Sequence, residues 1–298
     1  MNFEEFTKQI LDTMKEHYTE SEVRINQVRK NNGVILTAIN VMHKDSNMTP
    51  SIYLEGFYQM YMEGKSMQDI IDQIMEDIEE YAIHKEFDVS FFTDRSVMES
   101  KIGFKLIHYG KNEELLKDVP YFSYLDLAIV FICYVEDPSY GKATILIHEN
   151  HMKSLGMNKE ELMDMAMKNM PRMLEYEICN MFDLIRNMPF VSEEVLCDIE
   201  QEMAPVIYAC TNKSKFLGAS SILYPNLLKD FAIACGKDLI IIPSSIHEVL
   251  LVPVEDDSGK DEYNRMVEEV NATQLECQEI LSDHVYYYDR ELDEVIIP

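Results

Sequence analysis

The longest strongly apolar run in the chain, LAIVFICYV at residues 127–135, is only nine residues long. A helix needs about 20 apolar residues to cross a lipid bilayer, so this run predicts a buried strand and not a membrane span. The first residues, MNFEEFTKQI, lack the basic and apolar regions of a secretory signal. We therefore expect a cytoplasmic protein that does not enter the membrane.

Short strands joined by turns account for most of the β-type sequence. Asn31-Asn32-Gly33 is a turn signal between two apolar, β-branched segments, which predicts a β-hairpin over residues 22–42. The stretch EDPSYGK separates two further predicted strands, at 124–135 and 142–148, by its Pro and Gly. Strands connected this closely pair as antiparallel neighbours.

Helical periodicity of apolar residues alternates with these strands in no regular order. The predicted helices span residues 3–18, 52–64, 67–87, 94–117, 158–170, 172–187, 225–235 and 261–281. Because strands and helices do not alternate in a βαβ rhythm, the pattern favours an α+β fold. In such a fold, mixed helices accompany short, mainly antiparallel, hairpin-linked strands.

A formal net charge of −28, from 54 acidic and 26 basic residues, limits the partners of the protein. It disfavours direct binding of nucleic acid or of an anionic membrane, since both need clustered Lys and Arg. The excess is strong in residues 248–298, with 15 acidic and 3 basic residues, a net −12. Acidic surfaces ordinarily serve solubility. The other interpretation is a partner-blocking protein that mimics the phosphates of DNA.

One window departs from this acidic composition. Residues 205–229 contain three lysines and no Asp or Glu, a formal charge of +3. Within it, TNKSK combines the hydroxyl of Thr211, the amide of Asn212 and the ammonium groups of Lys213 and Lys215. Such groups, together with backbone N–H groups, can bind an anion. The window lacks the P-loop pattern GxxxxGK[ST]. The other interpretation is a solvated turn whose lysines pair with acidic residues of the same chain.

The segment PSSIHE lies between two apolar strands and brings together residue types used in nucleophilic hydrolysis. The candidate catalytic residues are Ser244, Ser245, His247 and Glu248. A triad requires a hydroxyl within about 3 Å of the imidazole, and adjacent His and Glu side chains point in different directions. The GxSxG elbow is absent. The alternative is a Ser-rich turn that satisfies its own backbone.

Metal or cofactor chemistry has little support in the sequence. His148-Glu149-Asn150-His151 has the spacing HExH and not the HExxH of zinc proteases. The six cysteines are scattered without CxxC spacing, which is typical of free, mostly buried thiols in a reducing cytoplasm. We expect neither a metal nor a cofactor.

Several segments together carry a resemblance to a known family. They are SIYLEGFYQMYMEGKS (51–66), TNKSKFLGASSILYPNLL (211–228), DLIIIPSSIHEVLLVP (238–253), EVNATQ (269–274) and LSDHVYYYD (281–289). The chain resembles the bacterial family called domain of unknown function 5688, and PSSIHE followed by LSDHVYYYD is the most specific combination. The resemblance implies a bacterial cytoplasmic protein forming one family-length unit over 1–298. If the unit has two lobes, the expected seam lies near 187–192. No activity is implied.

Taken together, these features favour a binding or interaction module over an enzyme, with a small anionic ligand or a protein as its partner. We expect its site where the TNKSK loop and the PSSIHE turn converge. The first alternative is a hydrolase that uses Ser244 or Ser245 with His247. The second is the acidic partner-blocking protein.

Overall fold

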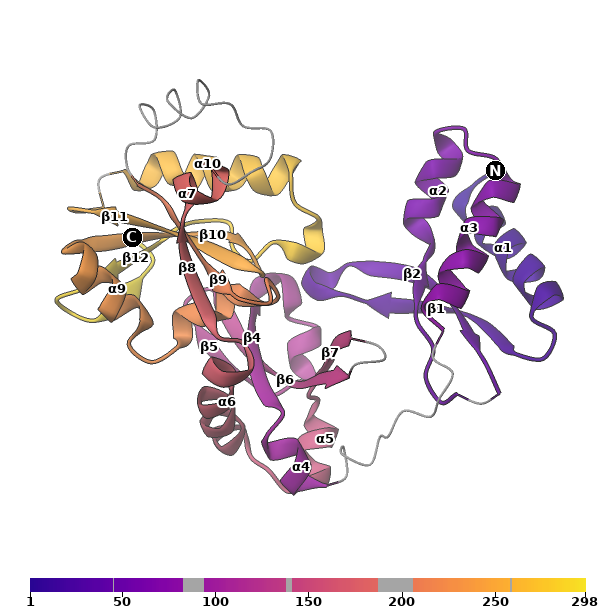
Figure 1. Ribbon diagram of the computed structural model, residues 1–298, viewed down its shortest axis with the longest axis horizontal. Helices are drawn as coiled ribbons and strands as arrows, with labels where there is room; N and C mark the ends of the chain where they lie inside the picture. The colour runs from indigo at the N-terminus through magenta and orange to yellow at the C-terminus, as the bar shows by residue number, and fades with distance from the viewer. Residues whose placement is uncertain (45, 83–93, 138–140, 187–205, 258) are drawn as a thin grey trace. The chain divides into compact units, whose positions relative to one another are not determined.

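The computed structural model describes residues 1–44, 46–82, 94–137, 141–186, 206–257 and 259–298. By the contacts among its residues the chain separates into two compact units, one within 1–93 and 136–142 and one within 94–135 and 143–298. Figure 1 shows their elements. The seam expected near 187–192 lies outside the described residues.

The first unit is a small antiparallel sheet with three helices. Its elements are α1 (Phe3–His17), β1 (Glu22–Arg29), β2 (Ile35–Met42), β3 (Ile52–Tyr53), α2 (Leu54–Met62) and α3 (Met67–Glu80). The strand order is β1-β2-β3. The pairing of Arg29 with Ile35 and of Glu22 with Met42 confirms the hairpin predicted over 22–42.

Amphipathic helices close the core of this unit. Phe6 and Ile10 of α1 and Ile70 and Ile74 of α3 are fully buried, at the spacing of one helix face. Both helices begin at side-chain caps, since Asn2 forms a capping box with Glu5 and the Ser66 hydroxyl accepts a hydrogen bond from the Asp69 N–H.

The second unit contains two antiparallel sheets. The six-stranded sheet has the order β13-β12-β10-β11-β9-β8. The other has the order β4-β6-β5, with β7 also paired to β6. The strands of these two sheets are β4 (Ile102–His108), β5 (Tyr121–Tyr124), β6 (Leu127–Asp137), β7 (Gly141–Leu146), β8 (Tyr176–Asn180), β9 (Tyr208–Asn212), β10 (Asp238–Ser245), β11 (Glu248–Val254), β12 (Tyr286–Asp289) and β13 (Glu294–Ile296).

Helices cover these sheets. The α-helices among the described residues are α4 (Arg95–Glu99), α5 (Glu149–Ser154), α6 (Lys159–Met173), α7 (Met181–Arg186), α9 (Leu227–Cys235) and α10 (Lys260–Thr273), and one of the 3-10 helices, η5, spans Gly218–Leu223. Helix α10 lies along one face of the six-stranded sheet, where Val267 packs against Ile240 and Val252 (Figure 1).

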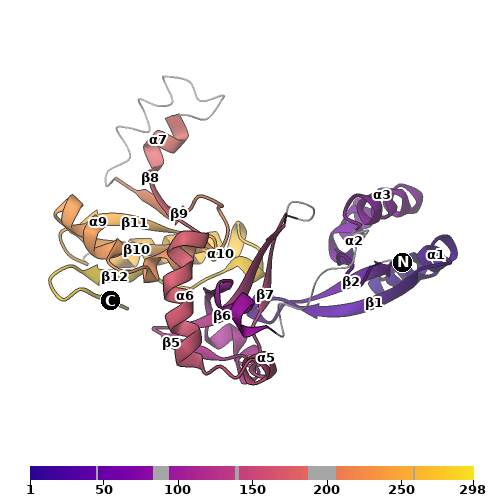
Figure 2. The same cartoon turned by 60° about the horizontal axis from the view of Figure 1, so that its bottom comes forward.

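Helix α6, labelled in Figures 1 and 2, lies close to β4, labelled in Figure 1, and this close approach explains a glycine within a buried strand. A Cβ atom on Gly103 would stand 2.8 Å from the sulfur atom of Met170 in α6. A residue larger than glycine would therefore force the Met170 side chain to move from its place between α6 and the sheet.

Two helix predictions were wrong. Residues 94–117, predicted to be mostly helical, contain only the short α4 before strand β4. Residues 172–187 were also predicted helical, yet β8 occupies Tyr176–Asn180 and pairs with β9. Short apolar segments fit both periods, and pairing with a neighbouring strand decided both cases.

The predicted α+β class is confirmed, because helices mix with sheets whose described pairings are antiparallel. Within the described ranges, no helix has the length and apolar character needed to cross a membrane.

Candidate functional site

The TNKSK loop is held by Asn212. Its side-chain oxygen accepts hydrogen bonds from the backbone N–H groups of Ser214 and Phe216, at 3.0 and 3.4 Å. Its side-chain nitrogen donates to the carbonyl of Phe216 at 2.7 Å. The side chain is also buried. Asn212 therefore shapes the loop, and its amide is already used by the backbone.

The two lysines of this loop pair with carboxylates in and just before the neighbouring strand β8. Lys213 lies 2.7 Å from Glu175, and Lys215 lies 2.9 Å from Glu177. The hydrogen bond from Lys215 lowers the pKa of Glu177 below its ordinary value, and the same contact raises the pKa of Lys215. All four side chains are exposed, so these are cross-strand surface pairs.

The PSSIHE turn largely satisfies itself. The Ser245 hydroxyl accepts a hydrogen bond from the backbone N–H of His247 at 3.0 Å. The Ser244 hydroxyl donates to the Glu248 carboxylate at 3.3 Å. The two serines thus contact the backbone and a carboxylate, while their hydroxyls form no hydrogen bond with the imidazole of His247.

The structure does bring the TNKSK loop and the PSSIHE turn together. The Thr211 hydroxyl donates to the backbone carbonyl of His247 at 2.8 Å. The backbone N–H of Leu217 donates to Nδ1 of the same residue at 3.2 Å. Because Nδ1 accepts, the proton of a neutral ring is on Nε2, which lies 3.9 Å from a carboxylate oxygen of Glu279. His247 therefore links two loops, and among the described residues no hydroxyl or thiol forms a hydrogen bond with its imidazole.

The HExH segment caps a short helix. The His148 ring nitrogen Nδ1 lies 2.8 Å from a carboxylate oxygen of Asp118. His151 Nδ1 accepts the backbone N–H of His148 at 3.2 Å, and burial together with the charge of His148 lowers the pKa of His151. In the part of the chain that the structure describes, no three His, Cys, Asp or Glu side chains come together as a metal site.

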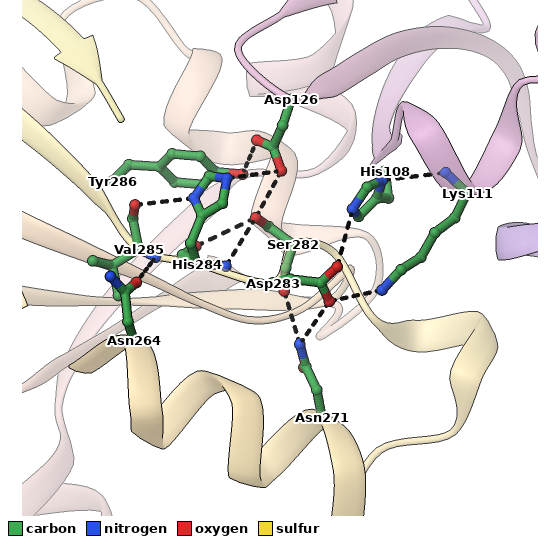
Figure 3. A network of polar contacts seen from close by, with 10 residues as sticks. All are labelled: His108, Lys111, Asp126, Asn264, Asn271, Ser282, Asp283, His284, Val285 and Tyr286. Atoms are coloured by element: carbon green, nitrogen blue, oxygen red, sulfur yellow. Dashed lines mark hydrogen bonds and ion pairs between the residues drawn. The ribbon is translucent and has the colours of Figure 1, made fainter. Parts of the chain in front are cut away.

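The LSDHVYYYD segment lies in a polar network within the second unit (Figure 3). Asp126, in the turn between β5 and β6, accepts hydrogen bonds from the hydroxyls of Tyr286 at 2.7 Å and Ser282 at 2.8 Å. His284 Nε2 lies 3.4 Å from the same carboxylate. Tyr286 and Ser282 are fully buried. One carboxylate thus satisfies two buried hydroxyls and links the two sheets.

A second carboxylate extends this network to the end of β4 (Figure 3). Asp283 lies 2.7 Å from Lys111 Nζ and 3.4 Å from His108 Nε2. Asn271 of α10 donates to the backbone carbonyl of Ser282 at 2.9 Å. These contacts position the segment before β12, and they give its polar side chains hydrogen-bond or ion-pair partners within the protein.

An open cavity lies elsewhere in the second unit, and we call it the α9 cavity. Its volume is about 460 Å³. Three segments form the α9 cavity, and they are the β5–β6 turn, the start of α9 and the β12–β13 hairpin. The residues that line it are Ser123, Tyr124, Leu125, Ile222, Tyr224, Asn226, Leu227, Leu228, Lys229, Tyr288, Asp293, Glu294 and Val295.

Lys229, Asp293 and Tyr288 form the polar group of this cavity. Lys229 Nζ lies 2.7 Å from one Asp293 oxygen, and the Tyr288 hydroxyl donates to the other at 2.7 Å. The hydrogen bonds from Lys229 and Tyr288 lower the pKa of Asp293. Burial and the bond to Asp293 raise the pKa of Tyr288, so the phenol stays protonated at neutral pH.

Left-handed backbone conformations concentrate at the same place. Six non-glycine residues in the described chain have left-handed φ, and three of them line the α9 cavity: Leu125, Asn226 and Asp293, with φ of 55°, 62° and 56°. Asn and Asp tolerate this region better than other residues, so the strain rests mainly on Leu125. A strained residue on the wall of a cavity is typical of functional sites.

Only some of the residues that line this cavity lie in segments that the sequence indicated. Lys229 belongs to the basic window 205–229, and Tyr288 belongs to LSDHVYYYD. Asp293 and Leu125 lie in no predicted site. The available signal for a site was that Lys229 lies in a basic window of an otherwise acidic chain. Nothing in the sequence indicates which lysine of that window faces a cavity.

Fold and cavity define an α+β protein built on antiparallel sheets, with a pocket of small-molecule size in its second unit. The chain belongs to the family of unknown function DUF5688, whose family model matches residues 3–290. No curated protein and no solved structure matches the chain.

Proposed function

We propose that the protein binds a small molecule carrying an anionic group in the α9 cavity. The single observation that carries this proposal is the placement of Lys229, a member of the basic window, on the wall of a 460 Å³ cavity. Cavities of a few hundred Å³ with apolar walls and a few convergent polar groups are the usual form of ligand sites.

Three features of the cavity favour an anion. The Lys229 ammonium uses one hydrogen on Asp293 and keeps two for a ligand. Helix α9 begins at the cavity without a side-chain cap; the Leu227 N–H donates to the Tyr224 carbonyl at 3.2 Å, so the N–H groups of Leu228 and Lys229 are the ones that a ligand could use. The exposed carboxamide of Asn226 lies at the same end.

The apolar part of the ligand would lie on the hydrophobic wall. Leu125, Ile222 and Leu227 line the cavity beside the polar group. Asp293 would act as a positioning residue, because its two oxygens hold Lys229 and the Tyr288 hydroxyl. The expected ligand is therefore amphipathic, with a carboxylate or phosphate at one end.

This proposal moves the anion site away from the loop favoured by the sequence. Lys213 and Lys215 are in exposed surface pairs, and Asn212 and Thr211 are used by backbone contacts. The hydrolase alternative needs a serine hydroxyl bonded to His247, and the serines have other partners. The partner-blocking alternative rests on charge alone.

A thermal-shift titration tests the proposal with three probes: inorganic phosphate, phenyl phosphate and hexanoate. A ligand at 100 times its dissociation constant stabilises the folded protein by about 2.7 kcal/mol, which raises Tm by several degrees. We expect a larger shift with phenyl phosphate or hexanoate than with inorganic phosphate, because only the first two bury an apolar part.

Matched lysine variants locate the site. Lys229→Met should abolish the shift, whereas Lys213→Met, which breaks a comparable exposed pair outside the cavity, should preserve it. A flat titration of the native protein with all three probes would overturn the proposal. Equal loss in both variants would show that the anions bind through net charge and not in the cavity.

A further inference from the structure

A second cavity, of about 340 Å³, lies beside strand β5 in the second unit. We call it the β5-edge cavity. It is lined by Leu116, Val119, Pro120, Tyr121, Phe122, Ser123, Glu149 and Lys159. Ser123 also lines the α9 cavity, and the other residues of the two cavities differ.

The cavity runs along an unpaired strand edge. Among the described strands, β5 is the last in the order β4-β6-β5, so alternate N–H and C=O groups on its outer side face no strand within the described ranges. Four consecutive residues, 120–123, line the cavity. Successive side chains of a strand point to opposite faces, so a cavity that contacts all four follows the edge. A ligand with its own amide or carboxylate could pair with that edge.

The floor of this cavity is apolar and fixed. Leu116 and Val119 are buried. The Phe122 ring packs edge-on against the buried ring of Phe131, with 6.2 Å between the centroids. Lys159 Nζ lies 4.7 Å from the centroid of the Phe122 ring. The aromatic ring is therefore held between a core residue and a cation.

Two opposite charges line the cavity without an ion-pair partner. Among the described residues, Glu149 and Lys159 have no salt bridge, although neighbouring charges do: Lys117 lies 2.6 Å from Glu114, and Glu161 lies 2.8 Å from Arg95. A carboxylate and an ammonium beside an apolar floor complement a zwitterion with an apolar side chain.

We propose that the β5-edge cavity binds a free α-amino acid or dipeptide with an apolar side chain. The ligand ammonium pairs with Glu149, its carboxylate pairs with Lys159, and its side chain lies on Phe122 and Leu116. In a dipeptide the amide would also pair with the edge of β5. This site is separate from the α9 cavity, and it does not depend on the anion proposed there.

Calorimetric titration of the native protein tests the ligand chemistry. The probes are L-leucine and leucyl-leucine, with N-acetyl-leucine, which lacks the ammonium, and leucinamide, which lacks the carboxylate. We expect binding of at least one unblocked probe and about tenfold weaker binding of both blocked forms, since each loses one charge-assisted contact. Comparison of leucine with leucyl-leucine shows which length fits.

Variants place the binding in the cavity. Glu149→Gln and Lys159→Met should each weaken binding at least about tenfold. The matched controls Glu160→Gln and Lys153→Met alter exposed residues of the same two helices that do not line the cavity, and they should leave binding unchanged. No heat from either unblocked probe up to about 10 mM, a range that reveals millimolar dissociation constants, would overturn the proposal. Equal binding of blocked and unblocked probes, or equal loss in control variants, would overturn it as well.

Discussion

The hydroxyl of Thr211 donates a hydrogen bond of 2.8 Å to the backbone carbonyl of His247 and so joins the end of β9 to the turn between β10 and β11. Gly218 passes directly over this bond. A Cβ atom at Gly218 would collide with the Thr211 hydroxyl and the His247 carbonyl, and it would stand 2.8 Å from the Thr211 Cα. Two of these three neighbours are backbone atoms, which cannot rotate away.

Gly218→Ala should therefore destabilise the second unit. Overpacking of this kind costs about 1–3 kcal/mol. Urea unfolding should show a lower midpoint with an unchanged slope. Gly110→Ala is the control, because the nearest atom to a Cβ there, in the His108 ring, is at an ordinary 3.6 Å. Equal midpoints for the two variants would contradict the close contact.

The junction that Gly218 permits was partly predictable. The TNKSK loop and the PSSIHE turn both lie at ends of C-terminal strands, and hairpin connection brings such ends together. Sequence could also indicate that Ser245 would satisfy its own turn. The sequence could not show that the backbone N–H of Leu217 would donate a hydrogen bond to Nδ1 of His247, because that contact depends on a left-handed backbone at Leu217.

The two cavities could not be predicted from sequence patterns, for a physical reason. The α9 cavity needs three segments that are distant along the chain, and its shape depends on which residues adopt left-handed φ. The β5-edge cavity depends on β5 being an edge strand, which follows from pairing of β6 with β4. Strand β4 lies within residues 94–117, where periodicity favoured a helix.

Asp126→Asn should destabilise the polar network at the β5–β6 turn. An amide nitrogen can only donate, so either the Tyr286 hydroxyl would lose its acceptor or the Ser282 hydroxyl would have to turn to its longer contact with the His284 carbonyl, at 3.3 Å. An unsatisfied buried hydroxyl costs about 1–3 kcal/mol. The measurement is the urea midpoint at neutral pH.

Asp118→Asn provides the comparison for this variant. Asp118 faces His148 with 71% of its side chain exposed, so its loss should change stability by no more than about 0.5 kcal/mol. If both variants unfold at the midpoint of the native protein, water satisfies the Ser282 and Tyr286 hydroxyls and the network is not a source of stability.

Leu125→Gly should weaken ligand binding at little net cost in stability. Leu125 has a φ of 55°, which costs a non-glycine residue about 1–2 kcal/mol, and glycine relieves that strain. Leu125 is 38% exposed, so the loss of its remaining buried surface, worth about 1–2 kcal/mol, offsets the relief. The same side chain lines the α9 cavity, so the binding of phenyl phosphate or hexanoate should decline. A loss of stability of more than about 2 kcal/mol, as for a buried leucine without strain, would contradict the assignment of strain.

Asp283 makes part of the stability dependent on pH. Burial alone would raise its pKa, but the hydrogen bond and charge of Lys111 outweigh burial and hold the pKa below its ordinary value. A carboxylate with a depressed folded-state pKa stabilises the protein above the unfolded-state pKa of about 3.9. That contribution is lost as pH falls through the lower folded-state value.

Lys111→Met should therefore lower the urea midpoint at pH 7, and the difference from the native protein should shrink toward about pH 3 as Asp283 becomes protonated. Lys153→Met, which removes an exposed charge from α5, should show no comparable change with pH. A difference for Lys111→Met that stays constant over this range would mean that Lys111 acts through packing and not through the carboxylate.

The cysteines offer a test of the sheet cores in the second unit. Cys133 of β6 and Cys210 of β9 are fully buried, and burial raises the pKa of each thiol to about 11. Alkylation needs the thiolate, which at pH 8 is about a thousandth of either group. Cys277, by contrast, is exposed.

Iodoacetamide at pH 8 should therefore modify Cys277 promptly and the two buried thiols only after denaturation, as peptide mapping by mass spectrometry would show. Rapid labelling of Cys210 in the native protein would mean that β9 opens readily, and the junction of Thr211 with His247 would then be too mobile to fix the neighbouring turn.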